Sequence, residues 1–233
     1  TDEGMPLGSF WGYVYEGVYQ TNEEAIEHQW QYKDRPGEIG VHAGDARYED
    51  LNNDGIIDDN DKTYIGNPFP KFTYGINMGV DFYGVDIQLF FQGVYGNEIL
   101  NLERRYLANV TASSNMMRET LQRWPYGEVN RATRKTTGEN GSCTSTFHLE
   151  DGSYLRLQNL SLSYTFPNKW LKKAKIKNMK VYLQGSNLFT FTNYSGFNPE
   201  VNKRADDALR PGEDYCSYPL SRTFSIGLNF NMH

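Results

Sequence analysis

The chain has 233 residues, of which 38% are hydrophobic and 15% aromatic, and it contains 17 tyrosines, 13 phenylalanines and 22 glycines. This composition favours a β-rich protein over a helical bundle, because aromatic residues are enriched in strands. The net charge of −6 offers no basic surface for nucleic acid, and the four scattered histidines predict no zinc or copper site. No run of about 18 apolar residues is present, so no transmembrane helix is predicted.

Residues 1–70 are expected to form a loop region that precedes the first long strand. Within it, residues 21–32 (TNEEAIEHQWQY) predict a short helix, because Thr21 or Asn22 can act as the N-cap and acidic residues follow in the first turn.

The stretch Asp50–Asp61 (DLNNDGIIDDND) follows the pattern of an EF-hand calcium loop. That pattern asks for oxygen ligands at positions 1, 3, 5, 9 and 12, a backbone carbonyl at position 7 and glycine at position 6. Gly55 stands at position 6, and aspartate replaces the usual glutamate at position 12. The candidate ligands of a structural calcium ion are Asp50, Asn52, Asp54, the Ile56 carbonyl, Asp58 and Asp61.

The alternative for this stretch is a surface turn rich in Asp and Asn, residues that favour turns without any metal. Extracellular calcium modules bind with dissociation constants of about 10⁻⁴–10⁻³ M, which would order a loop without organising a domain. Residues 62–72 (KTYIGNPFPKF) lead into a strand and not into the second helix of an EF-hand. A structural role is therefore favoured over a calcium sensor.

Period-two alternation then predicts five long strands of about 9–12 residues, the length that a tilted strand needs to cross a bilayer. In each strand apolar residues alternate with Asn, Asp, Gln, Ser, Thr or Gly. The five stretches are KFTYGINMGVDF (71–82), VDIQLFFQG (85–93), NLSLSYTF (159–166), NMKVYLQGSN (178–187) and RTFSIGLNFNMH (222–233).

The connections between these strands alternate in length. A tight turn around Gly84 joins the first pair, and about ten residues join the third and fourth strands. Long connections occupy residues 1–70, about 96–152 and about 188–220. Outer-membrane barrels have this alternation, with short periplasmic turns and long extracellular loops. An antiparallel sandwich with one wet face is the alternative, but it does not account for the alternation.

Five strands are too few to close a membrane barrel, which needs about eight. The expected fold is therefore all-β: about five transmembrane strands and long extracellular loops that form the C-terminal part of a larger barrel. Residues 71–233 would contain the strands, and a short loop helix is expected within residues 113–124 (SSNMMRETLQRW).

Several side chains of the long connections and strands are further candidates. Trp124, Tyr126, Phe147 and Tyr194 could stack on sugar rings, or belong to the aromatic girdles of a barrel. Arg156 and Arg222 could face the lumen, with a structural pairing inside the barrel as the favoured role. Cys143 and Cys216 could form a disulfide or be two unrelated thiols.

Five segments in order resemble the SusC/RagA-type TonB-dependent transporters of the outer membrane. They are PLGSFWGYVYEGVYQT (6–21), GDARYEDLNNDGIIDDNDKTYIGNPFPKFTYGIN (44–77), LEDGSYLRLQNLSLSYTFP (149–167), GSNLFTFTNYSGFNPEV (185–201) and YPLSRTFSIGLNFNMH (218–233). The ending Met232-His233 departs from the family, whose members usually end on an aromatic residue.

The resemblance implies an antiparallel outer-membrane barrel of about 22 strands, occluded by an N-terminal plug on which TonB pulls. It also implies a SusD-like surface lipoprotein as partner, outer-membrane lipids around the wall, and import of oligosaccharides or oligopeptides into a Gram-negative bacterium. The plug and the remaining barrel are expected outside this stretch of sequence, which by itself would not transport.

Two other functions compete with the importer. A secreted, calcium-stabilised β-sandwich that binds carbohydrate would explain the aromatic residues and the Asp-rich loop. An enzyme is not expected, because the sequence shows no nucleophile elbow, metal triad or phosphate loop, although its many carboxylates leave a glycosidase pair open.

Overall fold

The computed structural model describes residues 4–27, 29–32, 35–39, 41–108, 115–122, 124, 143–172, 175–201 and 210–232. The chain divides into two compact units, each formed by three separate stretches. We call residues 70–97, 151–200 and 218–233 the sheet unit, and residues 1–69, 98–150 and 201–217 the small-strand unit.

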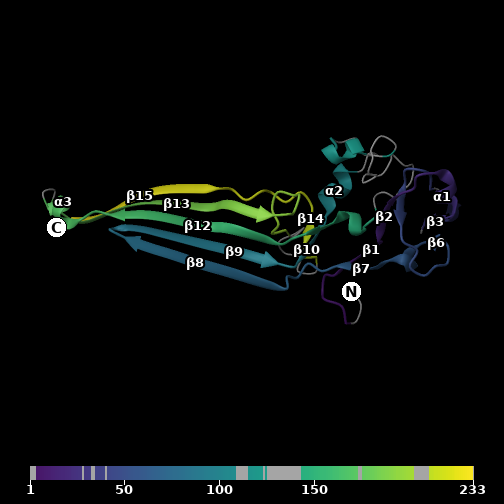
Figure 1. Ribbon diagram of the computed structural model, residues 1–233, viewed down its shortest axis with the longest axis horizontal. Coiled ribbons are helices and arrows are strands. Elements are labelled where there is room, and N and C mark those ends of the chain that lie inside the picture. Colours follow the sequence, from purple (N-terminus) through teal and green to yellow (C-terminus); the bar gives the residue numbers. More distant parts are fainter. Residues whose placement is uncertain are drawn as a thin grey trace. The chain divides into compact units, whose positions relative to one another are not determined.

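The sheet unit is built on one five-stranded antiparallel sheet, whose long strands run side by side in Figure 1. The order across the sheet is β15-β13-β12-β9-β8, so each strand lies beside one of its neighbours in the sequence. The strands are β8 (Phe72–Phe82), β9 (Val85–Tyr95), β12 (Tyr154–Thr165), β13 (Ile176–Thr192) and β15 (Thr223–Met232). All five predicted strands are therefore present in one sheet.

Short connections leave one end of this sheet and long connections leave the other. Tyr83 and Gly84 join β8 to β9 in a two-residue turn, and both have positive φ, as the tightest hairpin turns require. The helix α3 (Asn168–Leu171) lies in the connection from β12 to β13 at the same end. The predicted alternation of short and long connections is therefore confirmed.

The strand registers align the apolar side chains on one face of the sheet. Val80, Ile87 and Leu162 are directly paired across β8, β9 and β12, and Leu162 continues the row to Leu183 and Ile226. We call this the apolar face. The opposite, polar face has an equivalent row through Gly79, Gln88, Ser161, Gln184 and Ser225.

A β-bulge lets strand β12 keep its apolar face over its whole length. Leu157 pairs with Phe91, and Asn159 pairs with Phe90, so that Gln158 has no partner in β9. Leu155 and Leu157 precede the bulge, while the even-numbered leucines after it occupy the same face. An extra residue in one strand shifts its alternation by one position. Strand β12 consequently begins at Tyr154, five residues before the predicted start at residue 159.

Strand β13 is also longer than predicted, because it runs to Thr192 past an irregularity opposite Gln158. The connection expected from residue 188 therefore begins only after Thr192. Asn187, at this irregularity, has φ 55°, and the side chain of the following Leu188 is buried.

Two tyrosines cover glycines on the neighbouring strand. The Tyr74 ring lies where a Cβ on its direct partner Gly93 would project, and the Tyr182 ring lies in the same way against its partner Gly227. Tyr74 belongs to the apolar face and Tyr182 to the polar face. The side chain of the aromatic residue thus supplies the packing that glycine lacks.

The small-strand unit consists of short strands and short helices, and residues 4–66 contribute several of them. Its sheets pair β1 with β7, β2 with β5, β3 with β4 and β6, and β10 with β11 and β14. The strands are β1 (Phe10–Gly12), β2 (Tyr15–Val18), β3 (Gln29–Tyr32), β4 (Arg35–Ile39), β5 (Ala46–Tyr48), β6 (Ile56–Ile57), β7 (Thr63–Gly66), β10 (Glu98–Asn101), β11 (Leu149–Asp151) and β14 (Glu213–Asp214).

The helix predicted over residues 21–32 is only partly correct. Helix α1 (Asn22–Glu27) is present, and the Thr21 hydroxyl accepts a hydrogen bond from the Glu24 N–H at 3.2 Å, as an N-cap does. The chain then continues into β3, which pairs with β4 and β6. Strand pairing therefore replaces the second half of the predicted helix.

The remaining helices of this unit are also short. The 3-10 helix η2 (Arg118–Gln122) forms within the second predicted helix. Helix α2 (Leu102–Leu107) is N-capped by Asn101, whose side chain accepts from the Arg104 N–H. Two further 3-10 helices are η1 (Asp59–Asp61) and η4 (Thr146–His148). Within the described parts of the chain, no helix has the length and apolarity to cross a membrane.

Candidate functional site

The Asp-rich loop Asp50–Asp61 is closed by backbone hydrogen bonds to its own side chains. The two carboxylate oxygens of Asp50 accept from the N–H groups of Asn53 (2.7 Å) and Gly55 (2.8 Å). Asp54 accepts from the Ile56 N–H at 2.8 Å, and Gly55 has φ +79°. The sharp turn expected at this glycine is therefore present.

Asp61, at the last position of the pattern, is fully buried and joins the two ends of the loop. One of its oxygens accepts from the Leu51 N–H at 3.0 Å, and the other accepts from the Asp58 N–H at 2.7 Å. Asp58 in turn accepts from the Asn60 N–H at 2.7 Å and caps η1. These carboxylates hold the backbone of the loop through charge-assisted hydrogen bonds.

The loop is anchored to the small-strand unit through Ile56 and Ile57. These residues form β6, which pairs in parallel with β3, and Ile57 is buried in a cluster with Tyr13, Tyr19 and Tyr48. The surface formed by the loop is thus tied to a core of aromatic rings.

The oxygen donors of the loop and their order in the sequence fit calcium. The hydrogen bonds from the backbone to the carboxylates also fit the alternative, a surface turn that closes without a metal. Among the described residues, no three His, Cys, Asp or Glu side chains converge so that they could hold a metal ion. A calcium ion here would need Asn52 and the Ile56 carbonyl in addition to the carboxylates. Each bonded carboxylate oxygen keeps a second lone pair for such a contact.

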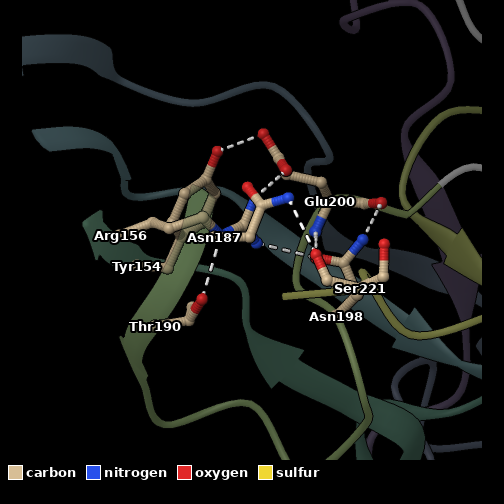
Figure 2. A network of polar contacts seen from close by, with 7 residues as sticks. All are labelled: Tyr154, Arg156, Asn187, Thr190, Asn198, Glu200 and Ser221. Atoms are coloured by element: carbon tan, nitrogen blue, oxygen red, sulfur yellow. Dashed lines mark hydrogen bonds and ion pairs between the residues drawn. The ribbon is translucent and has the colours of Figure 1, made fainter. Parts of the chain in front are cut away.

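A second polar cluster lies in the sheet unit around Arg156, and Figure 2 shows its hydrogen bonds. Arg156 projects from the polar face of β12 and is only 3% exposed. Its Nε donates to the Thr190 hydroxyl on β13 at 2.9 Å, and its guanidinium also donates to the Asn198 side-chain oxygen at 2.8 Å. The third partner is the Glu200 carboxylate, which also accepts from the Tyr154 hydroxyl at 2.5 Å.

This cluster confirms a structural pairing for Arg156, the role favoured from the sequence. Its partners Tyr154, Asn198 and Glu200 were not identified from the sequence. The sequence signal for this cluster is a lone arginine on a strand face whose neighbouring positions are uncharged. Such an arginine indicates a partner elsewhere in the chain, because a buried cation requires one. Which residue would supply that partner could not be derived from strand alternation.

The other candidate residues lie in different surroundings. Phe147 is half-buried: its ring centroid lies 4.9 Å from that of Tyr15, and the Arg104 guanidinium lies over the ring at 4.3 Å. Tyr194 is buried. Arg222 is exposed, with its guanidinium 5.9 Å from the Phe189 ring. Trp124 is half-buried, and Tyr126 lies outside the described residues.

Cys143 and Cys216, both of which belong to the described part of the small-strand unit, are thiols and do not form a disulfide. Burial raises the pKa of the Cys216 thiol, with Glu103 and Asp214 adding to the effect.

Comparison with curated proteins finds relatives among TonB-dependent receptors. "TonB-dependent receptor P3" of Formosa agariphila is 37% identical over 233 residues, an alignment that covers 97% of this chain and 22% of the relative. "TonB-dependent receptor SusC" of Bacteroides thetaiotaomicron is 25% identical over 236 residues, covering 97% of this chain and 19% of the relative. The chain thus spans about a fifth of the length of these relatives.

Comparison with solved structures identifies the same fold. A chain in the "Structure of the RagAB peptide transporter" superposes with a TM-score of 0.72 and 22% identity, covering 95% of this chain and 22% of that one. The 'open-open' state of the RagAB peptide importer gives a TM-score of 0.71. No family model matches the sequence.

The curated relatives are TonB-dependent receptors by name, and the solved structures share the fold over 95% of this chain. The resemblance inferred from the five sequence segments is therefore confirmed. The chain belongs to the SusC/RagA-type TonB-dependent transporters, as a segment of such a protein.

Proposed function

We propose that the chain is part of the barrel wall and loops of an outer-membrane importer that takes up oligosaccharides or oligopeptides. The observation that carries this proposal is the two-faced sheet, whose apolar rows continue across all five strands. The apolar side chains of its edge strands are exposed, for example Val80 at 62% and Ile226 at 80%. A lipid-facing wall requires such a face, with the polar face turned to an aqueous lumen.

The secreted β-sandwich is the second candidate. A sandwich buries one face of each sheet against the other sheet. The exposed apolar residues of β8 and β15 do not fit that arrangement, whereas acyl chains would cover them in a membrane. The importer is therefore the function that the exposed face favours.

The proposed partners follow from the family. A SusD-like surface lipoprotein would associate with the extracellular loops, while the plug and the remaining strands of the same transporter would complete the barrel. TonB would act through the plug from the periplasm. The names of the RagAB structures, which describe a peptide importer and transporter, support a ligand of oligopeptide size.

An uptake experiment with the full-length transporter tests the importer proposal. Cells with and without its gene would be supplied with fluorescent fractions of a casein digest or of malto-oligosaccharides, in the presence and absence of TonB. We expect uptake of one fraction that depends on both the transporter and TonB. Equal uptake of every fraction by cells that lack the gene would contradict the proposal.

We also propose that calcium binds the loop Asp50–Asp61 and stiffens it. The order of oxygen donors, the glycine turn and the anchoring through Ile57 support this assignment. A calcium ion held by these ligands would neutralise carboxylates that otherwise repel one another.

A further inference from the structure

The segment Asn193–Glu200 follows β13 at the end of the sheet from which the long connections leave, and we call it the strap. Asn198 and Glu200 bond to the guanidinium of Arg156, a residue of the polar face of β12. The strap therefore lies against the polar face, held by a residue from a strand other than the one it continues (Figure 2).

Arg156 holds the strap with a planar group that reaches three partners. Two of them, Asn198 and Glu200, belong to the strap, and the third, Thr190, belongs to the strand that leads into it. The guanidinium is 3% exposed, and burial of this charge is favourable only while its partners are in place, so the strap and the buried Arg156 stabilise one another. The strap is consequently fixed with respect to the sheet.

The strap is also ordered internally. Tyr194 is buried, and its ring occupies the position into which a Cβ on Gly196 would project. The Asn198 side chain donates to the Glu200 carbonyl at 3.1 Å and accepts from the Glu200 N–H at 3.3 Å, which folds the end of the segment into a turn. Pro199 restricts its own backbone and that of Asn198, which reduces the number of conformations available to the chain.

Phe197 is the exception to this pattern of burial. It lies between Gly196 and the buried Asn198, yet 70% of its side chain is exposed. A single exposed apolar side chain is common on protein surfaces. On a segment whose backbone is already ordered, however, such a ring can bind an apolar group without the further loss of conformational entropy that ordering a loop would require.

We propose that the strap is a rigid element, locked by Arg156, that presents Phe197 as a contact for the imported ligand. This inference rests on the proposed importer function. The chemistry recognised is an apolar surface, which an oligopeptide supplies as a side chain and an oligosaccharide supplies as the C–H face of a ring. Arg156 is a positioning residue, because it acts on the ligand through the strap.

Cysteine labelling in the full-length transporter tests whether Phe197 meets the ligand. In a Cys143→Ser/Cys216→Ser background, Phe197→Cys would be labelled on whole cells with a membrane-impermeant maleimide, with a casein digest or malto-oligosaccharides added as probes. We expect labelling, and slower labelling with one of the two probes, which also identifies the ligand class. Phe191→Cys, on the apolar face of β13, is the matched control and should show no protection. Labelling of Phe197→Cys at one rate under all conditions would overturn the inference.

Uptake kinetics test the positioning role of Arg156. Phe197→Ala should raise the half-saturating concentration of the active probe about tenfold, a change of roughly one unit in log affinity, while leaving the melting temperature unchanged. Phe197→Leu should retain part of the affinity, because it keeps apolar area. Arg156→Gln should weaken uptake in the same way, and adding Phe197→Ala to it should cause little further loss.

The failures of the two proposals are distinguishable. A parent transporter that takes up a probe, with Phe197→Ala equal to it, overturns the role of the strap and leaves the importer function intact. A parent that takes up neither probe overturns the proposed importer of these ligands and the strap inference together. If Arg156→Gln does not assemble in the outer membrane, Phe197→Ala and the labelling experiment still decide the role of Phe197.

Discussion

At the residue scale, Asp61 and Asp54 have different tasks within one acidic loop. Asp61 is fully buried and joins Leu51 to Asp58 through hydrogen bonds from both N–H groups. Asp54 lies at the exposed side of the loop and accepts from Ile56 N–H. The Asp61 carboxylate, which joins the two ends of the loop, stabilises the loop with or without a metal. The exposed Asp54 carboxylate contributes most to loop stability when an ion is bound.

Substitution of these two aspartates separates calcium binding from loop closure. Calcium at about 1 mM should stabilise the wild type by about 0.4–1.4 kcal/mol, from the linkage between binding and unfolding with a dissociation constant of about 10⁻³–10⁻⁴ M. Asp54→Ala should remove that increment, and Asp61→Ala should lower the melting temperature even without calcium. Thermal melts of the purified full-length transporter in calcium and in chelator measure both effects.

Asp59→Ala is the matched control for the calcium experiment. Asp59 lies in the same stretch, is not one of the expected ligands, and forms an exposed ion pair with Lys62, which contributes at most about 1 kcal/mol. It should keep the calcium response. Identical melts of the wild type in calcium and in chelator would leave the loop as a turn closed only by its own hydrogen bonds.

His148 illustrates how burial sets the charge of a single side chain. It is 2% exposed, its Nδ1 lies 3.3 Å from the Ser145 hydroxyl, and burial together with the nearby charges of Arg105 and Arg104 lowers its pKa from 6.5 to about 3. The folded chain therefore keeps this imidazole neutral where the unfolded chain would protonate it.

This depressed pKa predicts a pH-dependent stability. As pH falls below about 6.5, the unfolded state takes up a proton first, so stability is full above pH 6.5 and is lost progressively toward pH 3. His148→Gln should flatten that part of the profile, by an amount of the order of a few kcal/mol over the whole range. Melting temperatures between pH 7.5 and 4 provide the measurement, with the exposed His42→Gln as control. A profile unchanged by His148→Gln would contradict the prediction.

At the element scale, the sheet depends on aromatic rings that fill the space beside glycines. Tyr182 covers Gly227 on the polar face, and the two residues are direct partners of β13 and β15. Because β15 is an edge strand of this sheet, the cross-strand pair contributes to holding it in register. A methyl group on Gly227 would displace the ring.

Two glycine-to-alanine substitutions should therefore differ although both lie in long strands. Gly227→Ala should destabilise by about 1–2 kcal/mol, in the range of overpacked sites. Gly79→Ala should be neutral or slightly stabilising, since a Cβ there would come no closer than 3.9 Å to its nearest neighbour, the Ile87 carbonyl oxygen, and alanine orders a strand at less entropic cost.

The melting temperature of each full-length variant measures this difference. A double variant with Tyr182→Ser should recover most of the Gly227→Ala loss, because the two residues are in contact. Equal losses for Gly79→Ala and Gly227→Ala would show that the ring does not determine the requirement for glycine.

At the scale of the whole molecule, the exposed apolar face sets the conditions under which the transporter is stable. Water would contact side chains such as Val80, Ile226 and Phe224, which are 62%, 80% and 68% exposed. Such a face is a liability in water and an anchor in lipid.

The full-length transporter should therefore require detergent for extraction and should migrate as a folded species in SDS until it is heated. Ile76→Arg, on the apolar face near the middle of β8, should lower assembly in the outer membrane by a cost of about 2–4 kcal/mol, the range for a charge at the bilayer midplane. Asn77→Arg on the polar face of the same strand is the position-matched comparison. Heat-modifiability on gels and the amount of assembled protein measure both. A stable, soluble protein in plain buffer would contradict a membrane wall.

The sequence by itself determined the five long strands, their two faces and the alternation of short and long connections, because side-chain alternation and turn residues are local properties. It also determined the family, through five segments in the correct order. The pairings of β8 with β9 and of β12 with β13 followed from the short connections that join these neighbours in the sequence.

Only the tertiary structure decided the features that depend on contacts between distant residues. The bulge at Gln158 hid the first half of β12, since one extra residue reverses the alternation. The second half of the predicted helix over residues 21–32 became β3, which pairs with β4 and β6. The partners of Arg156 lie 42 and 44 residues away in the strap, and the physical reason is general: a buried charge demands a partner, but only folding brings one within reach.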